Sequence, residues 1–148
     1  MAQICSTARA AGFRDTVEVS PGVSEVVCMC AIAWRESRGN PDAYNGNVKT
    51  GDRSYGCWQI NMRDPNVARD VYEHIFNIPL DAGEAVPFAP NTEARLFDAL
   101  TNANAAWLLY GERVANLDEA WYIARPGVDR DEYLSFLPLA QAAALEKA

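Results

Sequence analysis

The chain has 148 residues, of which 49% are apolar and 22% charged, a balance typical of one compact globular domain rather than a disordered segment. Its formal net charge of −7 argues against nucleic acid as a partner, because binding to phosphates requires Lys and Arg concentrated along one surface. No apolar run reaches the roughly 18 residues that a membrane span needs. We therefore expect a single domain over residues 1–148, without a membrane span.

The N-terminus and the cysteines bear on the compartment. Residues 1–5 lack the basic segment, apolar core and cleavage site of an export signal, so we expect no signal peptide. Without export, cysteines are expected to be reduced and buried, and there are four of them: Cys5, Cys28, Cys30 and Cys57. The Cys28-x-Cys30 spacing suits neither a zinc site nor a redox pair, and His74 is the only histidine. The sequence therefore predicts no metal and no cofactor.

A central helix is predicted from residue 23 to residue 34. Apolar side chains fall at positions 23, 26, 27, 30, 31 and 34, which is the spacing of one helix face, and the opposite face is apolar too. We expect this helix to be buried nearly all round, with Ser20 as its cap and Pro21 in its first turn. The pattern ends where Gly39 can adopt the left-handed conformation that closes a helix. Glu36 is therefore expected in the last turn.

The segments after this helix predict a mainly α (α+β) domain. Residues 45–60 are rich in Gly, Asn, Asp and Ser, which favours a short, irregular β-hairpin. Residues 67–75 have the spacing of a short helix, and residues 79–90 are expected to form a loop. A further helix is expected to begin at Asp98 or Thr101 and to end near Gly111. Residues 129–148 predict two short helices separated at Pro138.

Glu36 is the candidate for chemistry. At the C-terminal end of a buried helix, desolvation and the negative end of the helix dipole both favour the protonated carboxylic acid. Such an acid can protonate a glycosidic oxygen, which is otherwise a poor leaving group. Spacing alone also allows a structural alternative, in which Glu36 pairs with Arg35 or Arg38 at the helix end.

Two segments carry a resemblance to a known family. Residues 31–43 (AIAWRESRGNPDA) and 51–62 (GDRSYGCWQINM) resemble the lysozyme-like and lytic transglycosylase superfamily, which includes goose-type lysozymes. The closest variants are the lysozyme-like domains of phage tail or virion proteins. In this family a helix ends in Glu-Ser, an Asn-Pro-x-Ala turn follows, and a Ser-x-Gly-Leu-x-Gln element forms the floor of the glycan groove. The resemblance covers about residues 11–122 and implies a lysozyme-like fold with a buried central helix, several packed helices and a small hairpin.

Carried over residue by residue, the resemblance implies a set of site residues. Glu36 matches the catalytic acid, and Cys57 stands where the family usually has Leu. The expected substrate-binding residues are Ser54, Tyr55, Gln59, Asn61, Asn102 and Trp121. Asn102 matches the Asn of an Asp-Pro-x-x-Asn helix entry, in which Ala99 replaces Pro. A late Ala-Tyr-Asn-x-Gly segment of many soluble transglycosylases is missing, so either Trp121-Tyr122 takes its place or Trp121 packs in the core.

Several assignments stay open at this point. A lysozyme needs a second carboxylate, for which Asp42 and Asp52 are the nearest candidates, whereas a lytic transglycosylase can finish with the 6-hydroxyl of muramic acid. Asp52 lies between Gly51 and Arg53, a setting more typical of a turn, so we favour a single-glutamate site. Aromatic residues near the expected groove can stack on sugars or pack in the core: Tyr44, Tyr55 and Trp58. A cysteine peptidase that uses Cys57 and His74 lacks any supporting motif.

The resemblance implies an enzyme that cleaves the MurNAc-GlcNAc β-1,4 bond of peptidoglycan, a glycosidase or lytic transglycosylase with Glu36 as general acid and base. Because a net charge of −7 disfavours long-range attraction to an anionic cell wall, we expect delivery by a phage virion or another machine that acts at the bacterial cell wall. The expected partners are the peptidoglycan glycan strand and other virion or tail proteins. The competing hypothesis is a non-catalytic lysozyme-like component of a phage particle, retained for structure or glycan binding.

Overall fold

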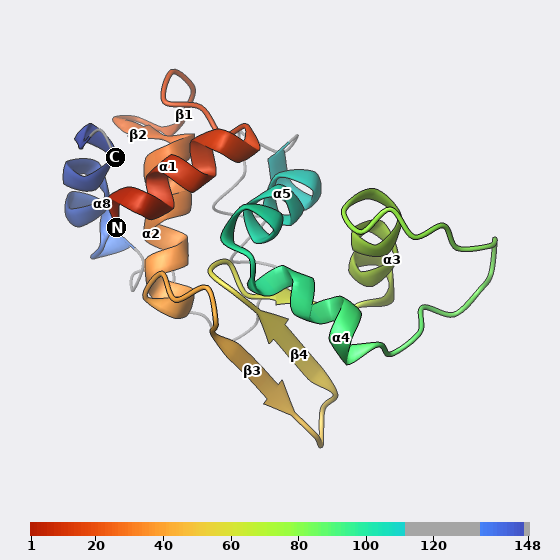
Figure 1. Ribbon diagram of the computed structural model, residues 1–148. Coiled ribbons are helices and arrows are strands. Elements are labelled where there is room, and N and C mark those ends of the chain that lie inside the picture. The colour runs from red at the N-terminus through yellow and green to blue at the C-terminus, as the bar shows by residue number, and fades with distance from the viewer. Residues whose placement is uncertain (112–133, 147–148) are drawn as a thin grey trace.

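The computed structural model describes residues 1–111 and 134–146, which form packed helices and two small antiparallel sheets (Figure 1). This agrees with the predicted mainly α class. Within these residues, no helix has the length and apolar character needed to cross a membrane.

α2 (Glu25–Ser37) is the central helix, and every residue from 25 to 33 is buried. α1 (Ala2–Ala11) and α8 (Leu137–Leu145) both pack against it, as Figure 1 shows. The alanines and cysteines of α2 are small, which allows neighbouring helices to approach closely. The buried helix predicted at residues 23–34 is therefore confirmed, although its end lies at Ser37.

The start of α2 differs from the prediction. Its cap is Ser24, whose hydroxyl accepts a hydrogen bond from the Val27 amide at 3.2 Å. Ser20, the predicted cap, instead lies in β1 (Glu18–Ser20), which pairs with β2 (Val23–Ser24) in a two-stranded sheet. A short strand pair thus precedes the helix, and the local Ser-Pro signal belongs to the turn between the two strands.

The first turn of α2 buries a charge. Glu25 is 0% exposed, and its carboxylate accepts hydrogen bonds from the Arg14 Nε at 2.6 Å and from the Arg14 amide at 3.1 Å. A buried carboxylate is tolerated only with such partners. This pair fixes residues 13–15 against the start of the central helix.

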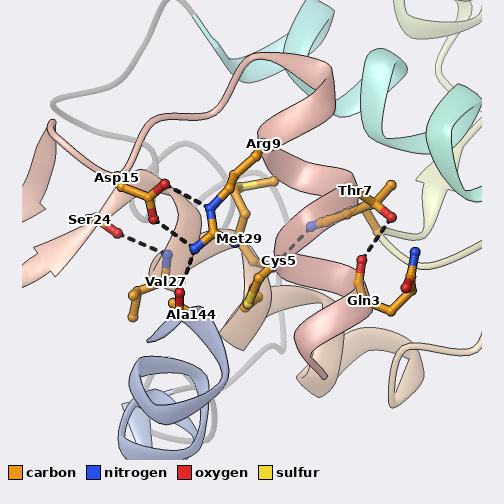
Figure 2. The surroundings of a disulfide bond; sticks show 11 residues. Gln3, Cys5, Thr7, Arg9, Asp15, Ser24, Val27, Met29 and Ala144 are labelled. Atoms are coloured by element: carbon orange, nitrogen blue, oxygen red, sulfur yellow. Dashed lines mark hydrogen bonds and ion pairs between the residues drawn. A yellow bond between two sulfur atoms is a disulfide. The ribbon is translucent and has the colours of Figure 1, made fainter. Parts of the chain in front are cut away.

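α1 is an element that the sequence analysis does not predict. Its buried side consists of Ile4, Cys5 and Ala8, and Cys5 forms a disulfide with Cys30 of α2, with a Cα–Cα distance of 5.6 Å (Figure 2). The expectation of reduced thiols is therefore wrong for this pair, whereas Cys28 and Cys57 are free and buried as expected.

Arg9 ties α1 to the C-terminal helix. Its guanidinium contacts the Asp15 carboxylate at 2.7 Å and donates to the Ala144 carbonyl at the end of α8, as Figure 2 shows. Charge near a helix C-terminus is favourable when it is positive, because the last carbonyls are otherwise unpaired. The N- and C-terminal helices are thereby joined on one side of α2.

A three-stranded sheet follows α2 and confirms the predicted hairpin. β3 (Tyr44–Asn47) pairs with β4 (Asp52–Tyr55), and β4 pairs with β5 (Ile60–Asn61), all antiparallel. In Figure 1 the β3–β4 hairpin starts near the C-terminal end of α2 and extends away from it. The turn between β4 and β5 therefore lies at the base of the hairpin.

The remaining elements cover the other side of this turn. α3 (Pro65–His74) matches the predicted helix at 67–75, and residues 79–89 form the expected loop. α4 (Pro90–Glu93) and the 3-10 helix η1 (Ala94–Phe97) lead into α5 (Ala99–Tyr110). The cap of α5 is Asp98, one of the two predicted starts, and its side chain accepts from the Thr101 amide at 3.0 Å.

The end of the chain requires one correction. Pro138 was expected to separate two helices, but it lies in the first turn of α8, where a missing amide N–H costs no helix hydrogen bond. Residues 129–133 of the predicted pair lie outside the described residues.

The disulfide predicts a measurable thiol count. Unfolding the unreduced protein in denaturant should expose two reactive thiols rather than four. Reduction should lower the free energy of unfolding by about 3 kcal/mol, because the bond closes a loop with a sequence separation of 25. In Cys5→Ala, a reductant should cause no further loss of stability. Four reactive thiols before reduction would contradict the pairing.

Candidate active site

Glu36 lies in the last turn of α2, as predicted. The helix closes immediately afterwards, because Arg38 adopts a left-handed conformation (φ 55°) and its amide donates to the Trp34 carbonyl at 3.0 Å. The residue as a whole is half-buried, and its Oε1 atom is shielded from solvent. The carboxyl group is therefore held at the margin of the core rather than extended into water.

Ser37 joins the end of α2 to the β4–β5 turn. Its hydroxyl lies 2.8 Å from the Cys57 carbonyl and 3.0 Å from the Ala33 carbonyl, and it accepts a hydrogen bond from the Gly39 amide at 3.1 Å. Because Ser37 is the neighbour of Glu36, this contact fixes the position of Glu36 relative to the turn. Ser37 therefore positions the neighbouring acid, Glu36, relative to the turn.

The turn itself, residues 56–59, is buried and held from two further sides. The indole of Trp58 donates to the Met29 carbonyl of α2 at 3.0 Å, and Trp58 is 0% exposed. Of the two open alternatives for Trp58, the structure supports packing in the core. The Cys57 thiol is also buried, which raises its pKa to about 11, so it stays protonated near neutral pH.

Asn102 of α5 bonds to the backbone of the β4–β5 turn and its neighbours, and we call its three hydrogen bonds the clamp. Its Oδ1 accepts from the Trp58 amide at 2.9 Å, and its Nδ2 donates to the carbonyls of Tyr55 at 2.8 Å and Leu96 at 3.0 Å. Asn102 is 0% exposed, so all of these bonds replace bonds to water. The side chain therefore positions the backbone next to the expected groove, and it is not accessible to a sugar.

Gly56 is required by this clamp. Its φ is +75°, a conformation that favours glycine, and a Cβ atom there would lie 2.7 Å from the Leu96 carbonyl oxygen. Close approach of the turn to α5 therefore depends on the missing side chain. This explains in physical terms why the Ser-x-Gly element contains glycine at this position.

Gln59 holds the start of the hairpin to the turn. Its Oε1 accepts from the Asn45 Nδ2 at 2.7 Å, and its Nε2 donates to the carbonyls of Gly56 at 2.9 Å and Ala43 at 3.3 Å. Gln59 is buried, with a left-handed backbone (φ 50°). Its expected contact with substrate stays a prediction, and its burial favours a positioning role.

Two expected substrate-binding residues share one face of the sheet. Ser54 lies directly opposite Asn45 in β3 and opposite Asn61 in β5, so these three side chains point to the same side. Ser54 and Asn61 are half-buried and Asn45 is exposed. We call these three residues the polar face; they retain surface that a glycan could contact.

The opposite face of β4 carries a buried charge network that sequence reasoning missed. Glu93 of α4 is 0% exposed and accepts from the Arg53 Nε at 3.0 Å and from the Tyr55 hydroxyl at 2.9 Å. Burial and this carboxylate together raise the pKa of Tyr55. Tyr55 therefore stabilises the sheet from its buried face. The partners are about 40 residues apart in sequence, and no local pattern links them.

Asp52 lies at the far end of β4, beside the turn of the hairpin. Its carboxylate accepts from the Thr50 hydroxyl at 2.9 Å and from the Arg63 Nη1 at 3.2 Å. The bond from Thr50 has the larger effect and that from Arg63 the next, and both lower the pKa of Asp52. The local bonds favour the turn-forming alternative over a role opposite Glu36, and the hairpin extends away from α2 (Figure 1).

The other residues raised by the sequence are separate from this arrangement. His74 is exposed on α3, and Tyr44 is 50% exposed with its ring 5.0 Å from that of Tyr55. Asp42 is exposed in the loop before β3. Trp121 lies outside the described residues.

The chain matches a known protein family. The family described as "Lysozyme like domain" matches residues 5–122, which is most of the chain. The chain belongs to the lysozyme-like domain family. Comparisons with curated proteins and with solved structures give no significant match. Family membership shows a lysozyme-like fold and supports a role related to peptidoglycan.

In this lysozyme-like domain, hydrogen bonds link the helix end that carries Glu36 to the polar face. The end of α2 is bonded to the turn through Ser37, and the turn is bonded to the polar face through Gln59 and Asn45. Glu36 and the polar face are thus parts of one hydrogen-bonded structure. A single carboxylic acid in such a place can act in proton transfer to a bound glycan.

The clamp predicts the stability of an Asn102 variant. Asn102→Ala removes the side chain that bonds the Trp58 amide and the carbonyls of Tyr55 and Leu96 inside the protein, so the free energy of unfolding should fall by about 2–4 kcal/mol. Asn104→Ala is the matched control on the same helix, since Asn104 is half-buried and should cost less than about 0.5 kcal/mol. Urea unfolding followed by fluorescence measures both. Equal losses in the two variants would show that the clamp contributes nothing specific.

Proposed function

We propose that this domain cleaves the MurNAc-GlcNAc β-1,4 bond of peptidoglycan, with Glu36 as the general acid and base. Support comes from the position of Glu36 in the last turn of a buried helix, bonded through Ser37 to the turn of the Ser-x-Gly element. A carboxyl group that is half-buried at a helix end stays accessible to a bound glycan, and carboxyl groups are the usual proton donors to a glycosidic oxygen.

The proposed reaction uses one carboxyl group. Glu36 protonates the leaving oxygen as the bond to the muramyl anomeric carbon breaks. Glu36, now a carboxylate, then accepts a proton from the nucleophile that attacks that carbon. If the nucleophile is the 6-hydroxyl of the same sugar, the product is an anhydro sugar; if it is water, the product is a reducing end. We favour the 6-hydroxyl route, because Asp52 is engaged by Thr50 and Arg63.

A glutamine variant tests the proposal. Glu36→Gln keeps the size of the side chain but removes the acidic proton, so release of muropeptides from purified sacculi should fall at least about 100-fold. Glu73→Gln is the matched control: it removes a carboxylate that pairs with Arg69 along α3, and it should leave the rate unchanged. Full activity in the Glu36 variant would exclude this mechanism.

Mass spectrometry of the digest separates the possible products. Anhydromuramyl ends support the 6-hydroxyl route, whereas reducing muramyl ends support hydrolysis with a water nucleophile. Saturable binding without any released muropeptide would instead support the competing hypothesis, a non-catalytic lysozyme-like component of a particle.

We further propose that the domain is delivered to the wall as part of a phage virion or a comparable machine. The supporting observation is the formal net charge of −7, which opposes long-range attraction to an anionic wall. An oligolysine tail fused to the domain should therefore accelerate digestion of sacculi at low ionic strength, and the gain should vanish in high salt. If the untailed domain digests sacculi equally fast, delivery is not needed.

A further inference from the structure

A basic pocket lies beside the same helix end as Glu36. Arg35, Arg38, Ser135 and Phe136 line a cavity of about 420 Å³ between the end of α2 and the start of α8. Arg35 directly precedes Glu36, and Arg38 is the residue that closes the helix. In a protein with a net charge of −7, two positively charged side chains thus line one cavity, and Arg38 is the more exposed of the two.

Arg38 is held in place by aromatic rings. The central carbon of its guanidinium lies 4.7 Å from the centre of the Phe136 ring and 5.9 Å from that of Trp34. Arg38 is exposed, and none of the ion pairs found among the described residues involves it. Stacking restrains the flat guanidinium while its N–H edge can still donate.

The edge of a guanidinium matches a carboxylate. Two parallel N–H groups can donate to the two oxygens of one carboxylate, which makes arginine selective for planar anions. The hydroxyl groups of a neutral sugar can also accept hydrogen bonds, but they carry no negative charge to pair with the guanidinium. The basic pocket is therefore chemically suited to a carboxylate rather than to the rings of a glycan.

We propose that the basic pocket binds a carboxylate carried by the muramyl residue of the substrate. This inference rests on the proposed function and names what the site recognises. The sugar rings of the glycan strand are uncharged, and its carboxylates hang from the muramyl residue, as the free lactyl group or as the acidic residues of a peptide attached to it. Arg35 and Arg38 lie within one helical turn of Glu36, so we infer that the bound carboxylate belongs to a muramyl residue close to the bond that Glu36 breaks.

Binding measurements in the Glu36→Gln protein test the pocket without cleavage. Three soluble ligands are titrated by calorimetry: GlcNAc-MurNAc, which carries a lactyl carboxylate; GlcNAc-MurNAc-L-Ala-D-Glu, whose carboxylates are in the peptide; and uncharged chitobiose. Adding Arg38→Gln should weaken binding of a carboxylate ligand about three- to tenfold and leave chitobiose unaffected. Arg38→Lys should restore part of the loss, since it keeps the charge but not the planar edge.

A matched control tests whether removing any arginine that lies against an aromatic ring has the same effect. Arg95 is exposed and lies 5.5 Å from the Phe76 ring, so Arg95→Gln removes a similar cation–aromatic pair elsewhere and should change no affinity. Circular dichroism and the melting temperature verify that each variant folds.

The results distinguish the two possible sources of the carboxylate, and two of the possible results would overturn the proposal. Loss for the dipeptide ligand alone assigns the pocket to a stem-peptide carboxylate, and loss for GlcNAc-MurNAc assigns it to the lactyl carboxylate. Unchanged affinity for both, or an equal loss for chitobiose, overturns the proposal. Cleavage by the Glu36→Gln protein would refute the proposed function alone, because these titrations would still report on the pocket.

Discussion

The hydrogen bond between Ser37 and the Cys57 carbonyl is the contact on which the proposed site depends. It joins the last turn of α2 to the turn between β4 and β5, and it is 2.8 Å long. Together with the bond from the Trp58 indole to the Met29 carbonyl, it fixes the helix end that carries Glu36 relative to the polar face of Asn45, Ser54 and Asn61. The helix end and the turn must therefore be rigid together for one acid to act on a bound strand.

That rigidity comes from buried polar groups rather than from the apolar core alone. Asn102 saturates the backbone of the turn, and Gln59 does the same for the start of the hairpin. On the far face of β4, Glu93 holds both Arg53 and Tyr55. Each of these three side chains bonds at least one partner from another element, so these contacts specify one arrangement of the sheet against the helices.

The sequence predicted the elements with strong local patterns and missed the rest for physical reasons. The apolar spacing of α2 and the closing residues after Glu36 are local, so the position of the acid could be predicted. Ile4 is the only large apolar side chain on the buried side of α1, so its pattern is weak, and the Cys5–Cys30 disulfide joins residues 25 positions apart, which spacing alone cannot indicate. The motif identified Asn102 and Gln59, but only coordinates show that they act through backbone. The Glu93 network pairs residues about 40 positions apart and leaves no local signal.

The most direct test of the account is a crystal structure of the Glu36→Gln protein with a bound peptidoglycan tetrasaccharide. We predict that the glycosidic oxygen between a MurNAc and a GlcNAc lies within about 3 Å of the residue 36 side chain. The strand should run along the polar face formed by Asn45, Ser54 and Asn61. A glycan bound on another surface, or separated from residue 36 by packed side chains, would contradict the assignment of the active site.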